Sequence, residues 1–172
     1  MPPAGFSSAT ALDELRTGIG LQAITDAHSM DELARAVGDA LTGLRLGVSA
    51  LDAAALTRIA GLEAWSIAEI VGHVLLMDAA AHAVARSLAI GRLPDAPPPY
   101  GVPGDPTAGR EALLAGIREA EERLAATRVL AAGGAVFAHA ELGPLDGRAW
   151  ILFSGVHAAA HLHQAAAVMR AR

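Results

Sequence analysis

The sequence predicts an all-α fold, a four-helix bundle, and three observations support this. The 172 residues are rich in Ala and Leu, with few β-branched runs and little alternation of apolar and polar residues. Four segments place apolar side chains at steps of three and four residues, the spacing of a helix that buries one face. Aromatic residues make up only 3% of the chain. We therefore expect one domain with a core of aliphatic side chains from closely packed helices.

The chain divides into residues 1–28, expected as an N-terminal arm, and residues 29–172, expected as the bundle domain. The arm is rich in small residues, and Gly18 and Gly20 would interrupt a helix there. We expect the arm to be partly flexible, with room for one short helix after Thr10.

The first two helices of the bundle each begin at a capping box, in which a serine hydroxyl and a glutamate carboxylate bind free amides at the helix end. Ser29 with Glu32 opens the first helix, and Ser66 with Glu69 opens the second. Gly91 is the expected end of the second helix. The apolar stripe of the first helix is Met30, Leu33, Val37, Leu41, Leu44, Val48 and Leu51. The inward face of the second is Ile70, His73, Met77, Ala80, Val84 and Leu88.

A proline-rich segment separates the second helix from the third. The segment from Arg92 to Pro106 contains six prolines. This number of prolines excludes a helix and predicts a long extended crossover. Asp105 as N-cap, with proline at the first helical position, then predicts the start of the third helix. A loop that contains His139 leads to the fourth helix, for which Asp146 is the expected N-cap.

Three histidines lie on the inward stripes of two different helices. His157 and His161 are four residues apart, so on a helix both imidazoles project from one face and can reach one ion. His73 occupies a position of the second helix where a bundle core would have Leu or Val. Buried imidazoles are costly unless something satisfies them, and a divalent metal would do so. Three protein ligands also leave a coordination site open, which is the catalytic pattern.

Each of these features has an ordinary alternative. The pair His157 and His161 could be two polar residues on an Ala-rich terminal helix. Glu69 could accept the second N–H of the His73 ring, although the capping box accounts for it equally well. Gln164 could orient His161 or contact a substrate, or it could be a polar residue near the end of the bundle. We expect three other histidines in or next to helices to lie at the surface: His28, His82 and His163.

His139 is a further candidate. From its loop it could approach a metal or a bound substrate at the mouth of the bundle, or it could be solvated. Trp65 and Trp150 are most simply anchors of the core or of a helix start.

Composition and charge exclude several classes of function. A net charge of −5 with scattered arginines provides no basic field for nucleic acid. The absence of cysteine excludes disulfides, cysteine-ligated zinc and a cysteine nucleophile. The first residues lack the charged start and apolar run of a signal peptide, and no stretch approaches the ~20 apolar residues of a membrane span. We expect a cytoplasmic protein without a nucleic-acid or membrane partner.

Two separated motifs give the chain a resemblance to the DinB-like superfamily. The stretch from Trp65 to His73 resembles the W-S-x-x-E-x-x-x-H signature of that family. The stretch from His139 to Gln164 resembles its H-x-x-x-G-x-L loop followed by H-x-x-x-H-x-x-Q. With the intervening helices, the resemblance covers about residues 30–170.

The resemblance implies an up-down-down-up four-helix bundle, usually dimeric. It also implies a divalent metal, often zinc or nickel, on His73, His157 and His161. Characterised relatives include thiol-dependent enzymes, such as mycothiol- and bacillithiol-using S-transferases and the mycothiol-dependent maleylpyruvate isomerase. Many others have no assigned activity, and some have lost metal ligands. This chain departs from the pattern at Ala140, where relatives often have proline after the loop histidine, so the shape of that turn is in question.

The leading hypothesis is a metal-dependent enzyme that acts on a small-molecule substrate. In one variant, the ion binds a low-molecular-weight thiol, lowers its pKa and presents the thiolate to an electrophile, as in an S-transferase. In another, a metal-dependent hydrolase, the ion binds water, with Glu69 or His139 as a base. The alternatives are a non-catalytic metal- or ligand-binding module of the stress response and a structural dimer with vestigial histidines.

Overall fold

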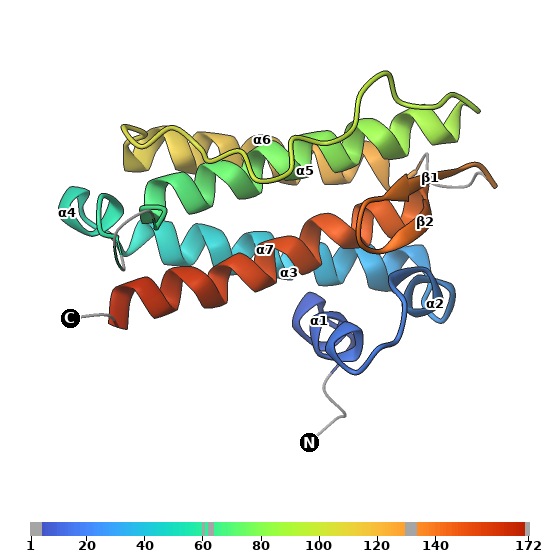
Figure 1. Cartoon of the computed structure of the whole chain (residues 1–172), viewed down its shortest axis with the longest axis horizontal. Helices are drawn as coiled ribbons and strands as arrows, with labels where there is room; N and C mark the ends of the chain where they lie inside the picture. Colours follow the sequence, from blue (N-terminus) through green and yellow to red (C-terminus); the bar gives the residue numbers. More distant parts are fainter. Residues whose placement is uncertain (1–4, 60, 62–63, 130–133, 171–172) are drawn as a thin grey trace.

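The fold is described from a computed structural model, which covers residues 5–59, 61, 64–129 and 134–170. α5 and α6 run in one direction along the molecule, and α3 and α7 run in the other (Figure 1). Each long helix packs on two of the others, so that α7 contacts both α3 and α5. The predicted up-down-down-up four-helix bundle is therefore confirmed. Its four long helices are α3 (Met30–Ser49), α5 (Ile67–Ala89), α6 (Arg110–Thr127) and α7 (Gly147–Arg170).

The segment before α3 forms two short helices, α1 (Ser8–Arg16) and α2 (Leu21–Asp26), which pack against α7. Ala11 of α1 and Leu21 of α2 are fully buried. The short helix expected after Thr10 is present as α1, and α2 is a second helix that the sequence did not indicate. The first four residues lie outside the described part of the chain. Both helices are short, so burial against α7 rather than local propensity stabilises them.

The capping boxes predicted for α3 and α5 are both present. The Ser29 backbone N–H donates to the Glu32 carboxylate at 2.8 Å, and the Glu32 backbone N–H donates back to the serine hydroxyl. Ser66 and Glu69 form the same pair at the start of α5. Gly91 follows the end of α5 with φ +71°, the left-handed conformation expected of a helix stop.

α6 begins later than predicted, because its N-cap is Gly109 rather than Asp105. The Asp105 carboxylate accepts hydrogen bonds from the backbone N–H and the hydroxyl of Thr107, at 2.8 and 2.7 Å. This local turn competes with the helix for backbone amides, so helical geometry starts only after it.

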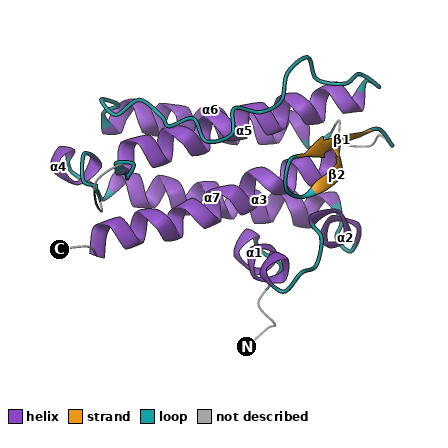
Figure 2. Ribbon diagram, in the orientation of Figure 1, coloured by secondary structure: helices purple, strands orange, loops and turns teal. Residues whose placement is uncertain are grey.

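A β-hairpin replaces the loop predicted before α7. β1 (Val136–His139) pairs antiparallel with β2 (Gly143–Asp146), and His139 lies opposite Gly143 (Figure 2). Gly143 has φ +75°, a conformation that side chains rarely allow, which makes the tight turn possible. The Asp146 carboxylate accepts a backbone N–H from the first turn of α7, so the predicted N-cap is confirmed. The hairpin thus holds His139 at a fixed position beside α7.

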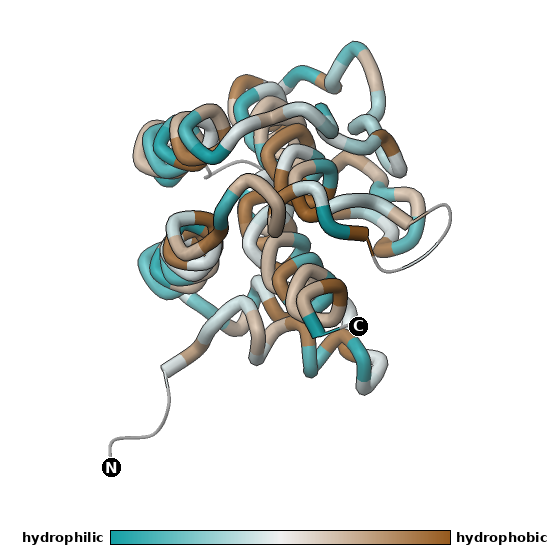
Figure 3. The backbone as a smooth tube through the Cα atoms, turned by 90° about the vertical axis from the view of Figure 1, so that its left-hand side faces the viewer, coloured by the Kyte–Doolittle hydropathy of each residue, from teal (hydrophilic) through white to brown (hydrophobic). Residues whose placement is uncertain are grey.

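The core consists of two apolar clusters that follow each other along the bundle. One surrounds the fully buried Trp150 near the hairpin, and the other surrounds Ile70 near α4 (Ala53–Leu56), the single helical turn between α3 and α5. In the end-on view, hydrophobic segments gather between the helices and hydrophilic segments face outward (Figure 3). Among the described residues, α5 is the one helix that by length and composition could cross a membrane, but 61% of its apolar window is buried inside the bundle. It is therefore a core helix by position.

His82 is fully buried, which corrects its predicted surface position. Its Nε2 lies 3.4 Å from the buried Asp78 carboxylate. Arg123 of α6 donates to the same carboxylate at 3.0 Å. The prediction fails because α6, α7 and β1 all pack on α5, so this helix buries more than one face.

Candidate metal centre

Three imidazoles meet where the two apolar clusters adjoin. His73 of α5 and His157 and His161 of α7 each place one ring nitrogen within 4.8 Å of the others. The Nε2 atoms of His73 and His157 are 3.1 Å apart. Nitrogens bound ~2.0–2.1 Å from one tetrahedral metal lie roughly 3.4 Å from each other, so this separation suits two ligands of one ion. The three histidines could therefore hold a metal ion.

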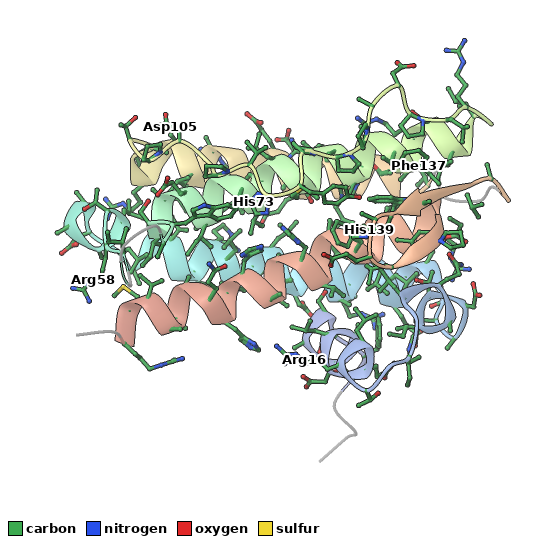
Figure 4. The ribbon with its side chains drawn as sticks, viewed as in Figure 1. Arg16, Arg58, His73, Asp105, Phe137 and His139 are labelled. Carbon is green, nitrogen blue, oxygen red and sulfur yellow. The ribbon has the colours of Figure 1, made fainter. Side chains whose placement is uncertain are left out.

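The fold brings the rings together in two steps. His157 and His161 lie on one face of α7 because four residues are close to one helical turn, and their ring centroids are 4.4 Å apart. The antiparallel neighbour α5 then places His73 at the same level, with its ring centroid 5.0 Å from each of the other two. His73 is buried, whereas the two histidines of α7 are partly exposed. Figure 4 shows His73 midway along the bundle.

Hydrogen bonds at Nδ1 orient two of the three rings. His73 Nδ1 lies 2.7 Å from the carbonyl oxygen of Val102. His161 Nδ1 lies 2.6 Å from the side-chain oxygen Oε1 of Gln164. Because both partners are oxygen acceptors, each Nδ1 carries the proton and donates, which leaves the lone pair on Nε2. Histidines that bind metals are commonly held in this way.

The crossover reaches His73 through a contact between two glycines. The Gly104 backbone N–H donates to the Glu69 carbonyl at 3.0 Å. A Cβ on Gly72 would lie 2.7 Å from the Gly104 Cα, and a Cβ on Gly104 would lie 2.4 Å from the Gly72 Cα. Only glycine at both positions permits this approach. The crossover therefore supplies the Val102 carbonyl to the site, and it is more than a connector.

The predicted supporting residues have different positions in the structure. The Glu69 carboxylate accepts hydrogen bonds from the backbone N–H and the hydroxyl of Ser66, both at 2.8 Å, so it is part of the helix cap. Gln164 is exposed and bonds the His161 ring, which is the orienting arrangement. Val102 had no sequence signal, because a backbone carbonyl can belong to any residue type.

Electrostatics keep the rings of α7 neutral. Burial, together with the smaller effects of the neighbouring His161 and His73, lowers the pKa of His157 to about 3. Burial also lowers the pKa of His161, against the opposite effect of its hydrogen bond with Gln164. Neutral imidazole is the form that binds a metal, so these nitrogens are ready to coordinate without losing a proton first.

A cavity of about 290 Å³ adjoins the site. It is lined by two of the three histidines, His73 and His157, and by Tyr100 of the crossover, His139 of the hairpin and Phe153 of α7. The sequence left two alternatives for His139: a solvated loop position or a position at the mouth of the bundle. The structure places it in the cavity wall, where it is only 6% exposed, and this fits the second alternative. The site thus has space beside it for a small molecule.

Trp65 covers the site from another direction. Its ring centroid lies 4.8 Å from that of His73 and 6.4 Å from that of His161. The anchor predicted before α5 is therefore also a wall of the histidine cluster, and its apolar ring limits access of water to it.

The sequence profile of the DinB superfamily matches residues 29–165. This chain belongs to the DinB superfamily. The family resemblance drawn from the two motifs is therefore confirmed, and α1 and α2 lie ahead of the matched region. A crystal structure described as that of TT2238, a four-helix bundle protein, is similar to this DinB chain with a TM-score of 0.61 and 23% identity. The similarity covers 81% of this chain and 99% of that chain, and it supports the fold. No protein with a curated function matches significantly.

Proposed function

We propose that this DinB-superfamily chain is a divalent-metal-dependent enzyme that acts on a small molecule, with His73, His157 and His161 as the metal ligands. The observation that carries the proposal is the convergence of the three imidazoles beside a cavity, with two rings already oriented through Nδ1. Imidazole donors suit zinc and nickel, and three of them leave a position for a substrate atom.

A bound ion would supply a Lewis acid that favours the deprotonated form of a thiol or of water. The residues of the chain do the rest. Val102 and Gln164 hold the ligand rings in place, and the aromatic rings of Trp65 and Phe153 restrict water around them. The partly exposed rings of α7 leave the cluster accessible.

Within this proposal we favour a thiol-dependent S-transferase over a hydrolase. Hydrolysis would use a base near the ion, and the two candidates are already engaged. Glu69 is held in the helix cap, and His139 Nδ1 accepts backbone N–H bonds from Glu141 and Leu142. A thiol with a lowered pKa brings its own nucleophile. In the transfer, the S–C bond forms as the leaving group departs from that carbon with the bonding electrons, and the thiol proton passes to solvent.

Elemental analysis of the purified protein tests the metal site. We expect one zinc or nickel ion per wild-type chain and loss of the ion in His157→Ala. His163→Ala is the matched control, because His163 is an exposed histidine of α7 outside the cluster. Bound metal should also raise the melting temperature, since it binds only the folded chain. Two results would contradict the proposal: full metal content in His157→Ala, or a metal-free protein whose melting temperature does not change when zinc is added.

Turnover separates an enzyme from a metal- or ligand-binding module of the stress response. Metal-loaded protein is assayed with mycothiol or bacillithiol against chlorinated and epoxide electrophiles, with metal-free protein and His157→Ala as controls. The S-transferase proposal predicts thioether formation only with the loaded wild-type protein. Equal rates for loaded and metal-free protein would favour the module.

We further propose a homodimer, which the family resemblance supports. Light scattering should then give twice the chain mass of 17.5 kDa. A mass of one chain at all concentrations would reject the dimer without affecting the metal site.

A further inference from the structure

Tyr100 of the crossover is a polar residue of the cavity that the metal cluster does not use. It lines the cavity together with His73 and His157, and 38% of its surface is exposed. Its ring meets that of His139 edge to face, with centroids 4.9 Å apart. The wall continues through Phe153, 4.6 Å from His139, to His157, 5.3 Å from Phe153. Tyr100 and two of the candidate metal ligands therefore line one space.

A turn of the crossover holds Tyr100 close to the histidines. The Val102 backbone N–H donates to the Pro99 carbonyl at 3.3 Å, and Gly101 has φ +70°, the left-handed conformation that such a turn requires. The Val102 carbonyl in turn accepts a hydrogen bond from His73 Nδ1 at 2.7 Å. Because two residues span at most about 7 Å, the turn fixes the Tyr100 backbone within a short distance of a candidate metal ligand.

The Tyr100 hydroxyl carries its proton and is accessible. Burial raises the pKa of this hydroxyl, and the Glu141 carboxylate raises it as well, against a hydrogen bond from the Ala140 backbone. A hydroxyl that accepts one hydrogen bond can still donate its own. The hydroxyl is only partly buried, so a molecule in the cavity can reach it.

The other polar side chains of the cavity do not offer an accessible donor of this kind. Two of them are candidate metal ligands. His139 Nδ1 accepts the backbone N–H groups of Glu141 and Leu142, at 3.1 and 3.3 Å, which leaves the ring proton on Nε2. That nitrogen is buried, with no hydrogen-bond partner among the described residues. Of the described residues that line the cavity, Tyr100 is therefore the uncharged side-chain donor that a bound molecule can meet.

The charges around the cavity indicate what this donor does. A cation on the three histidines would attract the thiolate of the proposed reaction. The field of the Glu141 carboxylate, by contrast, acts on the Tyr100 hydroxyl, and no lysine or arginine is among the described residues of the cavity wall. A negative charge that develops on the electrophile beside Tyr100 is therefore unfavourable unless a proton neutralises it. Oxygen is the leaving atom that needs this proton, because an alkoxide is a stronger base than a phenolate, whereas chloride leaves as a stable anion.

We propose that Tyr100 is a catalytic residue that donates its hydroxyl proton to the oxygen of an epoxide when a thiolate at the three histidines attacks the ring carbon. The S–C bond forms as the C–O bond breaks, the bonding electrons stay on the oxygen, and that oxygen takes the tyrosine proton. The tyrosine then regains a proton from solvent, and the product is a hydroxy thioether. The inference deepens the proposed function, on which it rests for the thiol, and it names an epoxide as the electrophile.

Binding to metal-free protein tests the contact without turnover. Tyr100 is the only tyrosine of the chain, so an isotope label at the tyrosine carbon that bears the hydroxyl gives one NMR signal. The probes are styrene oxide and ethylbenzene, which have similar skeletons with and without the epoxide oxygen. Styrene oxide should shift the signal and bind roughly two- to tenfold more tightly than ethylbenzene, the effect of one hydrogen bond. In Tyr100→Phe, which keeps the ring and removes only the hydroxyl, this preference should disappear.

Turnover of the metal-loaded protein with a thiol tests proton donation. In Tyr100→Phe, kcat for styrene oxide should fall roughly 100-fold or more, the usual contribution of a general acid. Benzyl chloride is the matched electrophile, because its chloride leaves without a proton, and the variant should convert it at the wild-type rate. The zinc content of the variant should equal that of the wild type, since Tyr100 is not a candidate ligand.

Three results would overturn the proposal: a tyrosine signal that styrene oxide leaves in place, an epoxide preference that persists in Tyr100→Phe, or a loss of kcat in that variant that is no larger for styrene oxide than for benzyl chloride. The first measurement needs neither a variant nor turnover. Where the wild type converts benzyl chloride and one of these results appears, Tyr100 alone is rejected and the proposed function stands. Where the loaded wild type converts neither electrophile, the proposed function is rejected and the catalytic role of Tyr100 with it.

Discussion

Gly72 and Gly104 touch where the crossover meets α5, and Gly72→Ala tests whether this contact positions a metal ligand. The new Cβ would lie 2.7 Å from the Gly104 Cα and 3.4 Å from the Asp105 nitrogen, with backbone atoms as the obstacles. The crossover must therefore move away from α5 by most of an ångström. That movement separates the Val102 carbonyl from His73 Nδ1, a hydrogen bond of 2.7 Å.

The magnitudes for Gly72→Ala follow from three effects. Overpacking costs about 1–3 kcal/mol of unfolding free energy. Loss of the His73 hydrogen bond adds about 1 kcal/mol, whereas alanine in place of glycine within a helix returns up to about 1 kcal/mol. We expect a net loss of about 1–3 kcal/mol. Zinc affinity should fall roughly 10- to 100-fold, the usual effect of removing the partner of a ligating histidine.

Urea unfolding of the metal-free protein measures the stability, and competition with a coloured chelator measures zinc affinity. The matched control is Gly47→Ala in α3, where a new Cβ would meet nothing within 4 Å. It should leave zinc affinity unchanged and raise stability by up to about 1 kcal/mol. A Gly72→Ala protein that binds zinc as tightly as the wild type would refute the idea that the crossover holds His73.

Three further substitutions test other parts of the structure. Gln164→Leu should weaken zinc binding about tenfold without lowering stability, because this exposed side chain bonds only a ligand ring; chelator competition checks it, and unchanged affinity would contradict it. Asp78→Asn should cost about 2–4 kcal/mol in urea unfolding, because it leaves the Arg123 contact without its buried carboxylate; stability like the wild type would show that this pair is not needed. Gly155→Ala should cost about 1–3 kcal/mol, because its Cβ would lie 2.5 Å from the Ser8 hydroxyl oxygen of α1 and 2.9 Å from the Val37 Cα of α3. A neutral result in urea unfolding would mean that the close approach of α7 to these two helices does not contribute to stability.

Local patterns in the sequence were sufficient for most of the bundle. Both capping boxes and the Asp146 N-cap were predicted correctly, because each depends on atoms only three residues apart. The start of α6 was not, because the Asp105 turn with Thr107 is an equally local alternative that the sequence alone cannot rank. α2 escaped prediction for another reason, since it packs against α7, far along the chain.

Some parts of the candidate site could likewise be predicted from the sequence, and others could not. The periodicity of the helices was enough to place His73, His157 and His161 on inward faces, and the family motif named the same three residues. The hydrogen bond between Gln164 and His161 was also within reach, because both lie on one turn of α7. By contrast, the partner of His73 could not be predicted from side-chain types, since it is the backbone carbonyl of Val102 in a segment distant in sequence.

The sequence by itself determined which stretches become the four long helices, where three of these begin, and which three histidines face inward, because these depend on spacing and end caps within one segment. Only the tertiary structure decided that the crossover holds a ligand ring, that His82 is buried and that His139 lies in a cavity wall with its Nε2–H unpartnered among the described residues. The physical reason is that burial and hydrogen-bond partners between distant segments depend on how closely their backbones approach. Here a pair of glycines and a short hairpin set that approach.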